Sequence, residues 1–211
     1  NEAHAFGYSG RFEEARRLVE PALPAADGAG ALPAQRWFHI VLGETWRDRG
    51  YGGRALENFQ HAVVLAEPAH QQASLVWSWV GVAQGHLLRG DGDEAAVALA
   101  HADEVGDSPV GTSAATRERT RAWLTACRGD LPAARTHVAA IADAMQSDGV
   151  IVFEAVLRHD LVRFGDAAAA VGRLAELAAV IEGPWIRVMA DHALAVASHD
   201  AAFLQLAVDQ F

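Results

Sequence analysis

Residues 42–68 read LGETWRDRGYGGRALENFQHAVVLAEP, and two helical patterns meet within this stretch. The first pattern places Leu42, Gly43 and Trp46 on one helical face, because side chains three and four residues apart lie side by side on a helix. Gly50 follows, and glycine often ends a helix because it adopts the left-handed conformation at little cost. Small and aromatic residues then recur at the spacing of a second helical face: Ala55, Phe59 and Ala62. The stretch therefore predicts two antiparallel helices joined at Gly50.

The same glycine, followed five residues later by alanine, recurs along the chain. The pairs are Gly10/Ala15, Gly50/Ala55, Gly90/Ala95, Gly129/Ala134 and Gly165/Ala170, with successive glycines 40, 40, 39 and 36 residues apart. A degenerate sixth copy lies at His199-Asp200. Repetition at this period is typical of stacked helical pairs, in which the alanine lets the two helices of a pair approach closely. Acidic residues near the turns suit the start of the following helix, and they are Asp91, Asp93, Asp130, Asp166 and Asp200.

The repeats predict an all-α fold, a right-handed α-solenoid of antiparallel helix pairs. We expect the first helices of the pairs at about 34–48, 70–88, 112–127, 150–164 and 184–197, after a remnant at 1–8. We expect the second helices at about 11–20, 53–66, 93–105, 131–146, 167–182 and 200–211. The segment 21–33 carries three prolines and several glycines, so we expect it to be non-helical. Residues 106–111 form a shorter break.

The two ends of the chain bear on its organisation. Asn1 is not an initiator methionine, and the last residues stop inside an apparent helix. We therefore expect residues 1–211 to be one repeat domain of about five to six helix pairs, cut from a longer polypeptide.

Composition excludes several functional classes. The chain is 51% hydrophobic with a net charge of −10, and its apolar runs are too short for a membrane span. It contains no lysine, which removes the phosphate-binding lysine of a P-loop. Its acidic balance argues against nucleic-acid contact by this segment. The single cysteine, Cys127, cannot form an internal disulfide, so we expect a cytoplasmic protein with a buried thiol.

No catalytic constellation stands out, and we expect neither an enzyme nor a bound cofactor or metal. The ten histidines include no His-Glu-x-x-His pair. His101 with Asp103, and His159 with Asp160, are interpreted as surface residues. The arginine groups at 16–17 and 117–121 have acidic neighbours and are interpreted as solvated helix surface.

The stretch at 42–68 resembles the tetratricopeptide repeat, with its large-small pair, its aromatic one turn later and its closing proline, Pro68. The first helix of each pair lines the inner, concave face of such a solenoid. Aligning the units on their alanines predicts the inward residues: Trp37, Glu44, Arg47, Trp77, Gln84, Arg119, Trp123 and His159. The three tryptophans suit a sugar, a planar ligand or an apolar peptide side chain. The alternative is that they only pack, and that Glu44 and His159 are solvated.

Three further stretches resemble the helical arm of large LuxR-type, MalT-like transcriptional regulators. They are GDLPAA at 129–134, FGDAAAA at 164–170 and ALAVASHDAAFLQLA at 193–207, with YSGRFEEA at 8–15 similar to an early repeat of such arms. The resemblance implies a sensor arm that binds a small-molecule effector or a protein partner, with an ATPase and a DNA-binding domain elsewhere in the polypeptide. The alternative function is a plain tetratricopeptide scaffold that binds a peptide segment of another protein.

Overall fold

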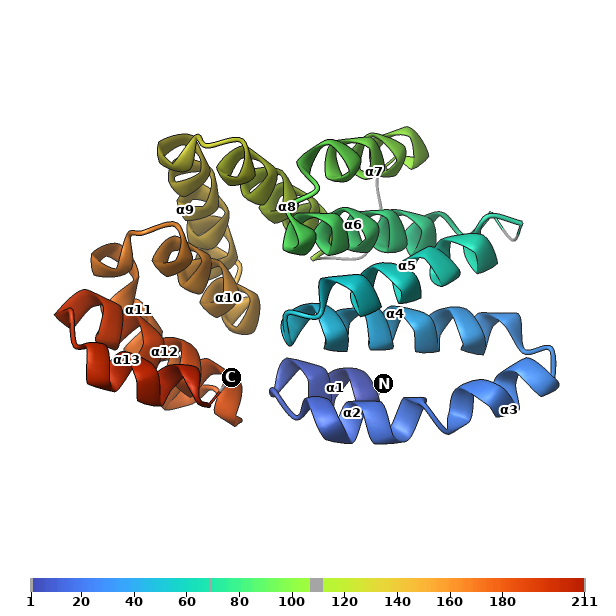
Figure 1. Ribbon diagram of the computed structural model, residues 1–211, viewed down its shortest axis with the longest axis horizontal. Coiled ribbons are helices and arrows are strands. Elements are labelled where there is room, and N and C mark those ends of the chain that lie inside the picture. Colours follow the sequence, from blue (N-terminus) through green and yellow to red (C-terminus); the bar gives the residue numbers. More distant parts are fainter. Residues whose placement is uncertain (1, 69, 107–111, 211) are drawn as a thin grey trace. The chain divides into compact units, whose positions relative to one another are not determined.

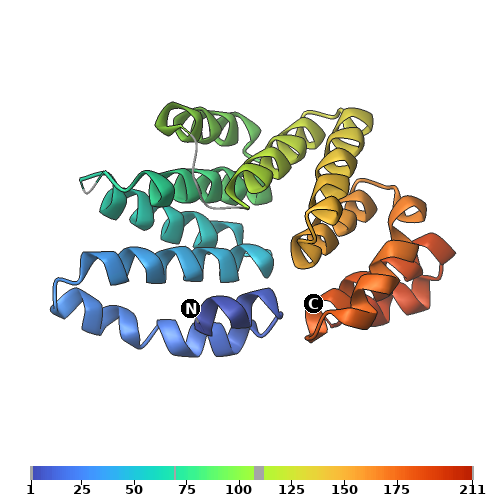
Figure 2. The same ribbon diagram turned by 180° about the vertical axis from the view of Figure 1, so that it is seen from behind.

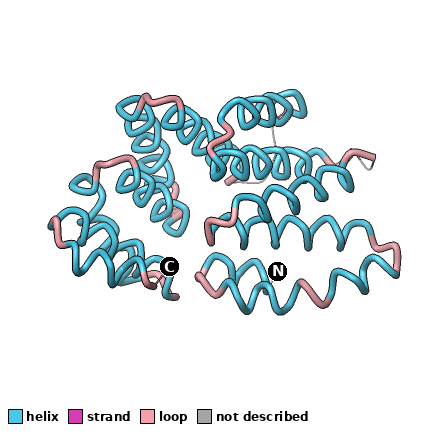
Figure 3. Tube along the Cα trace, viewed as in Figure 1, coloured by secondary structure: helices cyan, strands magenta, loops and turns pink. Residues whose placement is uncertain are grey.

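The computed structural model describes residues 2–68, 70–106 and 112–210. Within these residues the chain forms thirteen helices and no strand, which confirms the all-α prediction (Figures 1 and 3). Asn1, Phe211 and most of the predicted break at 106–111 lie outside the described residues.

The helices follow one another with short turns. They are α1 (Glu2–Tyr8), α2 (Phe12–Val19), α3 (Ala22–Gly28), α4 (Leu32–Asp48), α5 (Gly52–Ala66), α6 (Gln72–Arg89), α7 (Gly92–Val105), α8 (Ser113–Cys127), α9 (Leu131–Ser147), α10 (Ile151–Arg163), α11 (Ala167–Val180), α12 (Pro184–Ser198) and α13 (Ala201–Val208). Apart from α3, which was not predicted, their bounds lie within two or three residues of the predicted ones.

The segment 21–33 was expected to be non-helical, and this expectation is wrong. Ala22–Gly28 forms helix α3. Pro21 is the residue that precedes the helix, Pro24 lies in its first turn, and Pro33 lies in the first turn of α4. The N–H groups of a first turn have no partner within the helix, so proline loses nothing there.

The turns between paired helices form as the repeat predicts. Gly50 and Gly90 each have a φ near +80°. This is the left-handed conformation, which glycine adopts easily and which strains residues that have a β-carbon. His199 takes the same conformation, with a φ of 55°, at the sixth copy of the turn. After three of the turns, an aspartate accepts a hydrogen bond from the backbone N–H three residues on: Asp130, Asp166 and Asp200.

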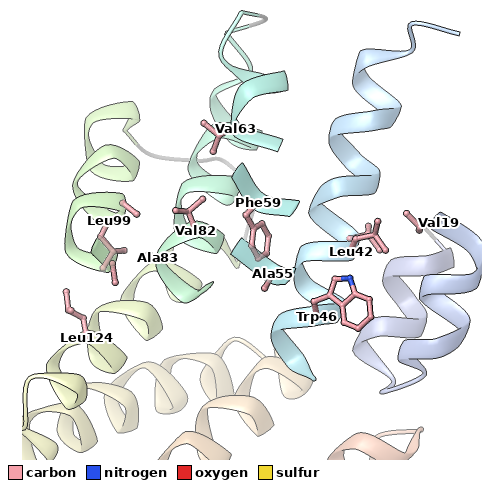
Figure 4. Close-up of a cluster of buried hydrophobic side chains, with 13 residues drawn as sticks. Val19, Leu42, Trp46, Ala55, Phe59, Val63, Val82, Ala83, Leu99 and Leu124 are labelled. Carbon is pink, nitrogen blue, oxygen red and sulfur yellow. The ribbon is translucent and has the colours of Figure 1, made fainter. Parts of the chain in front are cut away.

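The alanine of each repeat is shielded from solvent by the packed helices. All five are completely buried: Ala15, Ala55, Ala95, Ala134 and Ala170. Phe59 on α5 is equally buried, and its ring fills the space beside Gly43 on α4 and Gly81 on α6. Figure 4 shows Phe59 at the centre of the apolar cluster formed by these helices. Trp46 also belongs to this cluster.

The contacts divide the chain into two compact units. The first comprises Asn1–Gly7 and Phe12–Arg128, and the second Tyr8–Arg11 and Gly129–Phe211. In the first unit α4, α5 and α6 lie side by side, as both views show (Figures 1 and 2), and first helices also contact each other, α4 with α6 and α6 with α8. In the second unit α10 contacts α12 in the same way. Successive helix pairs within each unit are therefore stacked through their first helices.

Candidate functional site

Polar and aromatic side chains from four first helices meet in the first unit. We call this set the first-helix cluster: His4 of α1; Trp37, Glu44 and Arg47 of α4; Trp77 and Gln84 of α6; and Thr120 of α8. Most of its contacts between helices join residues 33 to 40 positions apart, which is close to the length of one repeat. The cluster therefore forms because equivalent faces of successive first helices are stacked.

Glu44 is the charged residue at the centre of the cluster. Its side chain is buried, and its Oε1 accepts a hydrogen bond of 3.0 Å from the indole N–H of Trp77. The Nε2 of His4 lies 2.7 Å from its Oε2. Burial by itself raises the pKa of Glu44, but the close contact with His4, the charge of Arg47 3.9 Å away and the hydrogen bond from Trp77 outweigh it. The pKa stays below its ordinary value, so this buried carboxylate is charged.

Three aromatic rings surround the carboxylate on one side. The rings of Trp37 and Trp77 meet edge to face, with centroids 6.2 Å apart. The imidazole of His4 lies 5.2 Å from the ring of Trp37, also edge to face, and 5.7 Å from the ring of Trp77. Both tryptophans are half-buried. The two indoles and the carboxylate of Glu44 thus enclose the imidazole of His4.

A chain of hydrogen bonds continues from this centre across the next helices. Arg47 donates from Nη1 to Oε1 of Gln84 at 2.9 Å, and Gln84 donates from Nε2 to the hydroxyl of Thr120 at 3.0 Å. Arg47 also binds both carboxylate oxygens of Asp48, at 2.7 and 2.9 Å. The charge of Arg47 is therefore shared between Asp48, which it binds through two hydrogen bonds, and Glu44, 3.9 Å away.

Five of the predicted inward residues belong to the cluster: Trp37, Glu44, Arg47, Trp77 and Gln84. Arg119 and Trp123 are half-buried on α8, the helix that carries Thr120. Glu44 was one of the residues expected to be solvated, and it is buried instead because three cluster residues cover it. His4 and Thr120 were not among the residues predicted from the sequence. The alignment of the repeats could have identified His4, because it precedes Gly10 by six residues just as Glu44 precedes Gly50 by six.

His159 occupies the corresponding position in the second unit. It is buried rather than solvated, because its Nε2 lies 2.9 Å from Nδ1 of His192 on α12. The two rings share one hydrogen bond, so one of the two nitrogens must be unprotonated. Burial, followed by the nearby charge of Arg163, lowers the pKa of His192 and favours its neutral form. Its neighbour Asp160, expected at the surface, is completely buried.

The arginines of α8 are more buried than expected. Arg117 is buried, with its guanidinium 3.2 Å from Asp103 and 3.3 Å from the carbonyl of Gly106. Burial raises the pKa of Asp103, but the hydrogen bonds from Arg121 and Arg117 outweigh it, and the pKa is lowered. His101 stacks on the ring of Trp79 at 4.6 Å.

No metal site was identified in the part of the chain that the structure describes. Within these residues, no group of three or more metal-ligating side chains is arranged to hold an ion.

Cys127 was expected to be buried, and it is exposed. It is the last residue of α8, and the residues that follow it up to 133 are exposed as well. The C-terminal end of α8 is therefore exposed to solvent, whereas several residues in the middle of the helix are buried.

No helix among the described residues combines the length and apolarity needed to cross a bilayer. Comparisons of the chain with protein-family models, with curated proteins and with solved structures returned no match.

Proposed function

We propose that the chain is a non-catalytic, tetratricopeptide-like sensor domain of a LuxR-type regulator, folded as a right-handed solenoid. In this proposal the face made by the first helices binds a small-molecule effector or a protein partner. The proposal combines the sequence resemblance with the regular stacking of helix pairs.

The first-helix cluster is the observation that supports a binding role for this face. A charged, buried carboxylate and two half-buried indoles converge there from α4 and α6. Binding sites typically combine aromatic walls with a few well-placed polar groups. A buried charge is costly to keep in a purely structural core, where apolar residues of similar volume would often be as stable.

A sensor role requires a ligand to bind two states of the protein with different affinity. The cluster suits this requirement because its members come from α1, α4, α6 and α8, so a ligand seated there contacts several repeats at once. A small change in the stacking of these helices would change its fit.

Tryptophan fluorescence titration against a metabolite library tests the proposal. We expect a ligand whose affinity falls at least tenfold when Trp37, Trp77 and Trp123 are all replaced by phenylalanine, which preserves most of the apolar volume. Trp185→Phe, in the second unit, is the matched control and should leave the affinity unchanged. Binding that is indifferent to the triple substitution would contradict the proposal. Binding of peptides alone, with the same sensitivity, would favour the scaffold function instead.

A further inference from the structure

The imidazole of His4 occupies the centre of the first-helix cluster. One of its nitrogens lies 2.7 Å from the carboxylate of Glu44, and its ring contacts both Trp37 and Trp77. The imidazole of His4 thus lies between two indole rings and a buried carboxylate. The groups around it indicate which class of ligand could take its place.

Aromatic rings around a carboxylate favour organic cations over neutral or anionic ligands. The face of an indole ring carries partial negative charge and attracts cationic groups, most strongly where water is excluded. One oxygen of Glu44 accepts from Trp77, and the other faces His4. A ligand in the place of His4 therefore meets a negatively charged acceptor, which calls for an N–H donor that carries a positive charge. Arg47 lies 3.9 Å from Glu44 and is also bound to Asp48 and Gln84, so it offsets only part of the charge of Glu44.

The helix that carries His4 is weakly held. Helix α1 has seven residues, fewer than a helix needs to be stable by itself, and none of them is fully buried. The contact between His4 and Glu44 is one of those that dock this helix. A short helix without a fully buried residue can be displaced at a lower free-energy cost than a core helix.

We infer that the space between Trp37, Trp77 and Glu44, which the imidazole of His4 fills, is a site for organic cations with an N–H donor, and that His4 is its internal occupant. An imidazolium, guanidinium or alkylammonium ligand competes with His4 and releases α1 from α4 and α6. Binding at the site is thereby converted into a change in the position of a helix. The inference rests on the proposed function, since it names the ligand class for the same face.

Calorimetric titration of the purified chain tests the inference, with agmatine and histamine as cationic probes and glucose as the neutral probe. His4→Ala vacates the pocket, so we expect it to bind the cationic probes at least tenfold more tightly than the unsubstituted chain. His61→Ala removes an exposed histidine of the same unit and serves as the matched control, with unchanged affinity. Adding Glu44→Gln to His4→Ala should abolish the gain, because the amide keeps the shape and removes the charge.

Amide hydrogen exchange provides a second readout. Saturating the unsubstituted chain with agmatine should raise the exchange of residues 2–8, because α1 is released. Equal or weaker cation binding by His4→Ala, or a gain that survives Glu44→Gln, would overturn the inference. If cations fail to bind while glucose or another library ligand still depends on the tryptophans, the inference is overturned and the proposed function stands. If no ligand depends on the tryptophans, the proposed function fails.

Discussion

Glu44 illustrates what a single buried carboxylate requires in a helical stack. Its transfer from water is unfavourable, and several neighbours offset that cost: a hydrogen bond from Trp77, a histidine at 2.7 Å and an arginine at 3.9 Å. These neighbours come from three different helices. The charge of Glu44 is therefore maintained only while the helices stay stacked.

Replacing Glu44 with glutamine gives a prediction with a defined pH dependence. We expect Glu44→Gln to lower the free energy of unfolding near neutral pH by about 1–3 kcal/mol, because hydrogen bonds to a charged group are lost. The pKa of Glu44 is lower in the folded chain than its ordinary value of 4.5. Its contribution is therefore complete above that value and is lost as the pH falls through the lower, folded pKa.

Urea denaturation of both proteins between about pH 7 and about pH 3 measures this effect. The difference in unfolding free energy should be largest near neutral pH and should shrink below about pH 4.5. A difference that stays constant, or grows as the pH falls, would contradict the charged state assigned to Glu44.

The exposed thiol of Cys127 gives a second prediction at the residue scale. Because the side chain is exposed at the end of α8, Ellman's reagent should titrate one thiol per chain without denaturant. A Cys127→Ser variant is the control and should show no reaction. Modification that begins only in urea would show that the thiol is covered.

At the scale of the elements, the close approach of α4, α5 and α6 depends on two glycines. A β-carbon on Gly81 would lie 2.3 Å from the ring of Phe59, and one on Gly43 would lie 2.9 Å from it. Real β-carbons do not approach other atoms this closely, so the ring or a helix would have to shift. Phe59 is fully buried, which leaves its ring little room to move.

Gly81→Ala should therefore destabilise the chain although alanine is the better helix former. We expect a loss of about 1–3 kcal/mol in unfolding free energy, as is typical of an overpacked core. Gly172→Ala, on α11, is the matched control, since nothing lies near a β-carbon there, and it should be neutral or slightly stabilising. The prediction is wrong if the thermal melts of the two variants coincide.

The helices were predictable because the turn chemistry is local. Gly50 and Gly90 adopt the left-handed conformation that ends a helix, and Ala55 and Ala95 are fully buried. Helix α3 was not predicted because its prolines were taken to exclude a helix. A proline is tolerated before a helix or in its first turn, which is where Pro21 and Pro24 lie.

The candidate site was predictable only in part. Aligning the repeats on their alanines predicted Glu44 and Gln84 as inward residues. His4 lies at the equivalent position of the first repeat, and equivalent positions of neighbouring repeats lie close together in the structure. It could not show that Glu44 is buried, since burial depends on contacts between distant helices. Thr120 lies outside the frame because it precedes Gly129 by nine residues, whereas Glu44 and Gln84 precede their glycines by six.

At the scale of the whole molecule, each of the two compact units has its own buried polar contacts. In the second unit Glu154 is completely buried on α10 and accepts hydrogen bonds of 2.8 and 2.9 Å from Arg173 on α11. Arg158, one turn along α10, lies 3.5 Å from the same carboxylate. This carboxylate therefore ties the two helices of one pair together.

Removing Glu154 should affect one unit more than the other. We expect Glu154→Ala to raise amide hydrogen exchange in α10 and α11 at least tenfold, because two buried guanidinium contacts are lost, while α4, α5 and α6 keep their protection. Mass spectrometry of peptides from both units measures this. An equal rise in α4 to α6 would show that the units open together.

The central claim is that ligands bind to the first-helix face at Trp37 and Trp77. Fluorine NMR of the chain labelled with 5-fluorotryptophan tests it most directly, because each of the six tryptophans gives its own resonance, assigned by single Trp→Phe variants. Titration with agmatine or with a ligand from the library should shift the Trp37 and Trp77 resonances saturably and leave the core residue Trp46 unchanged. Saturable shifts confined to other tryptophans, with Trp37 and Trp77 unmoved, would contradict the account.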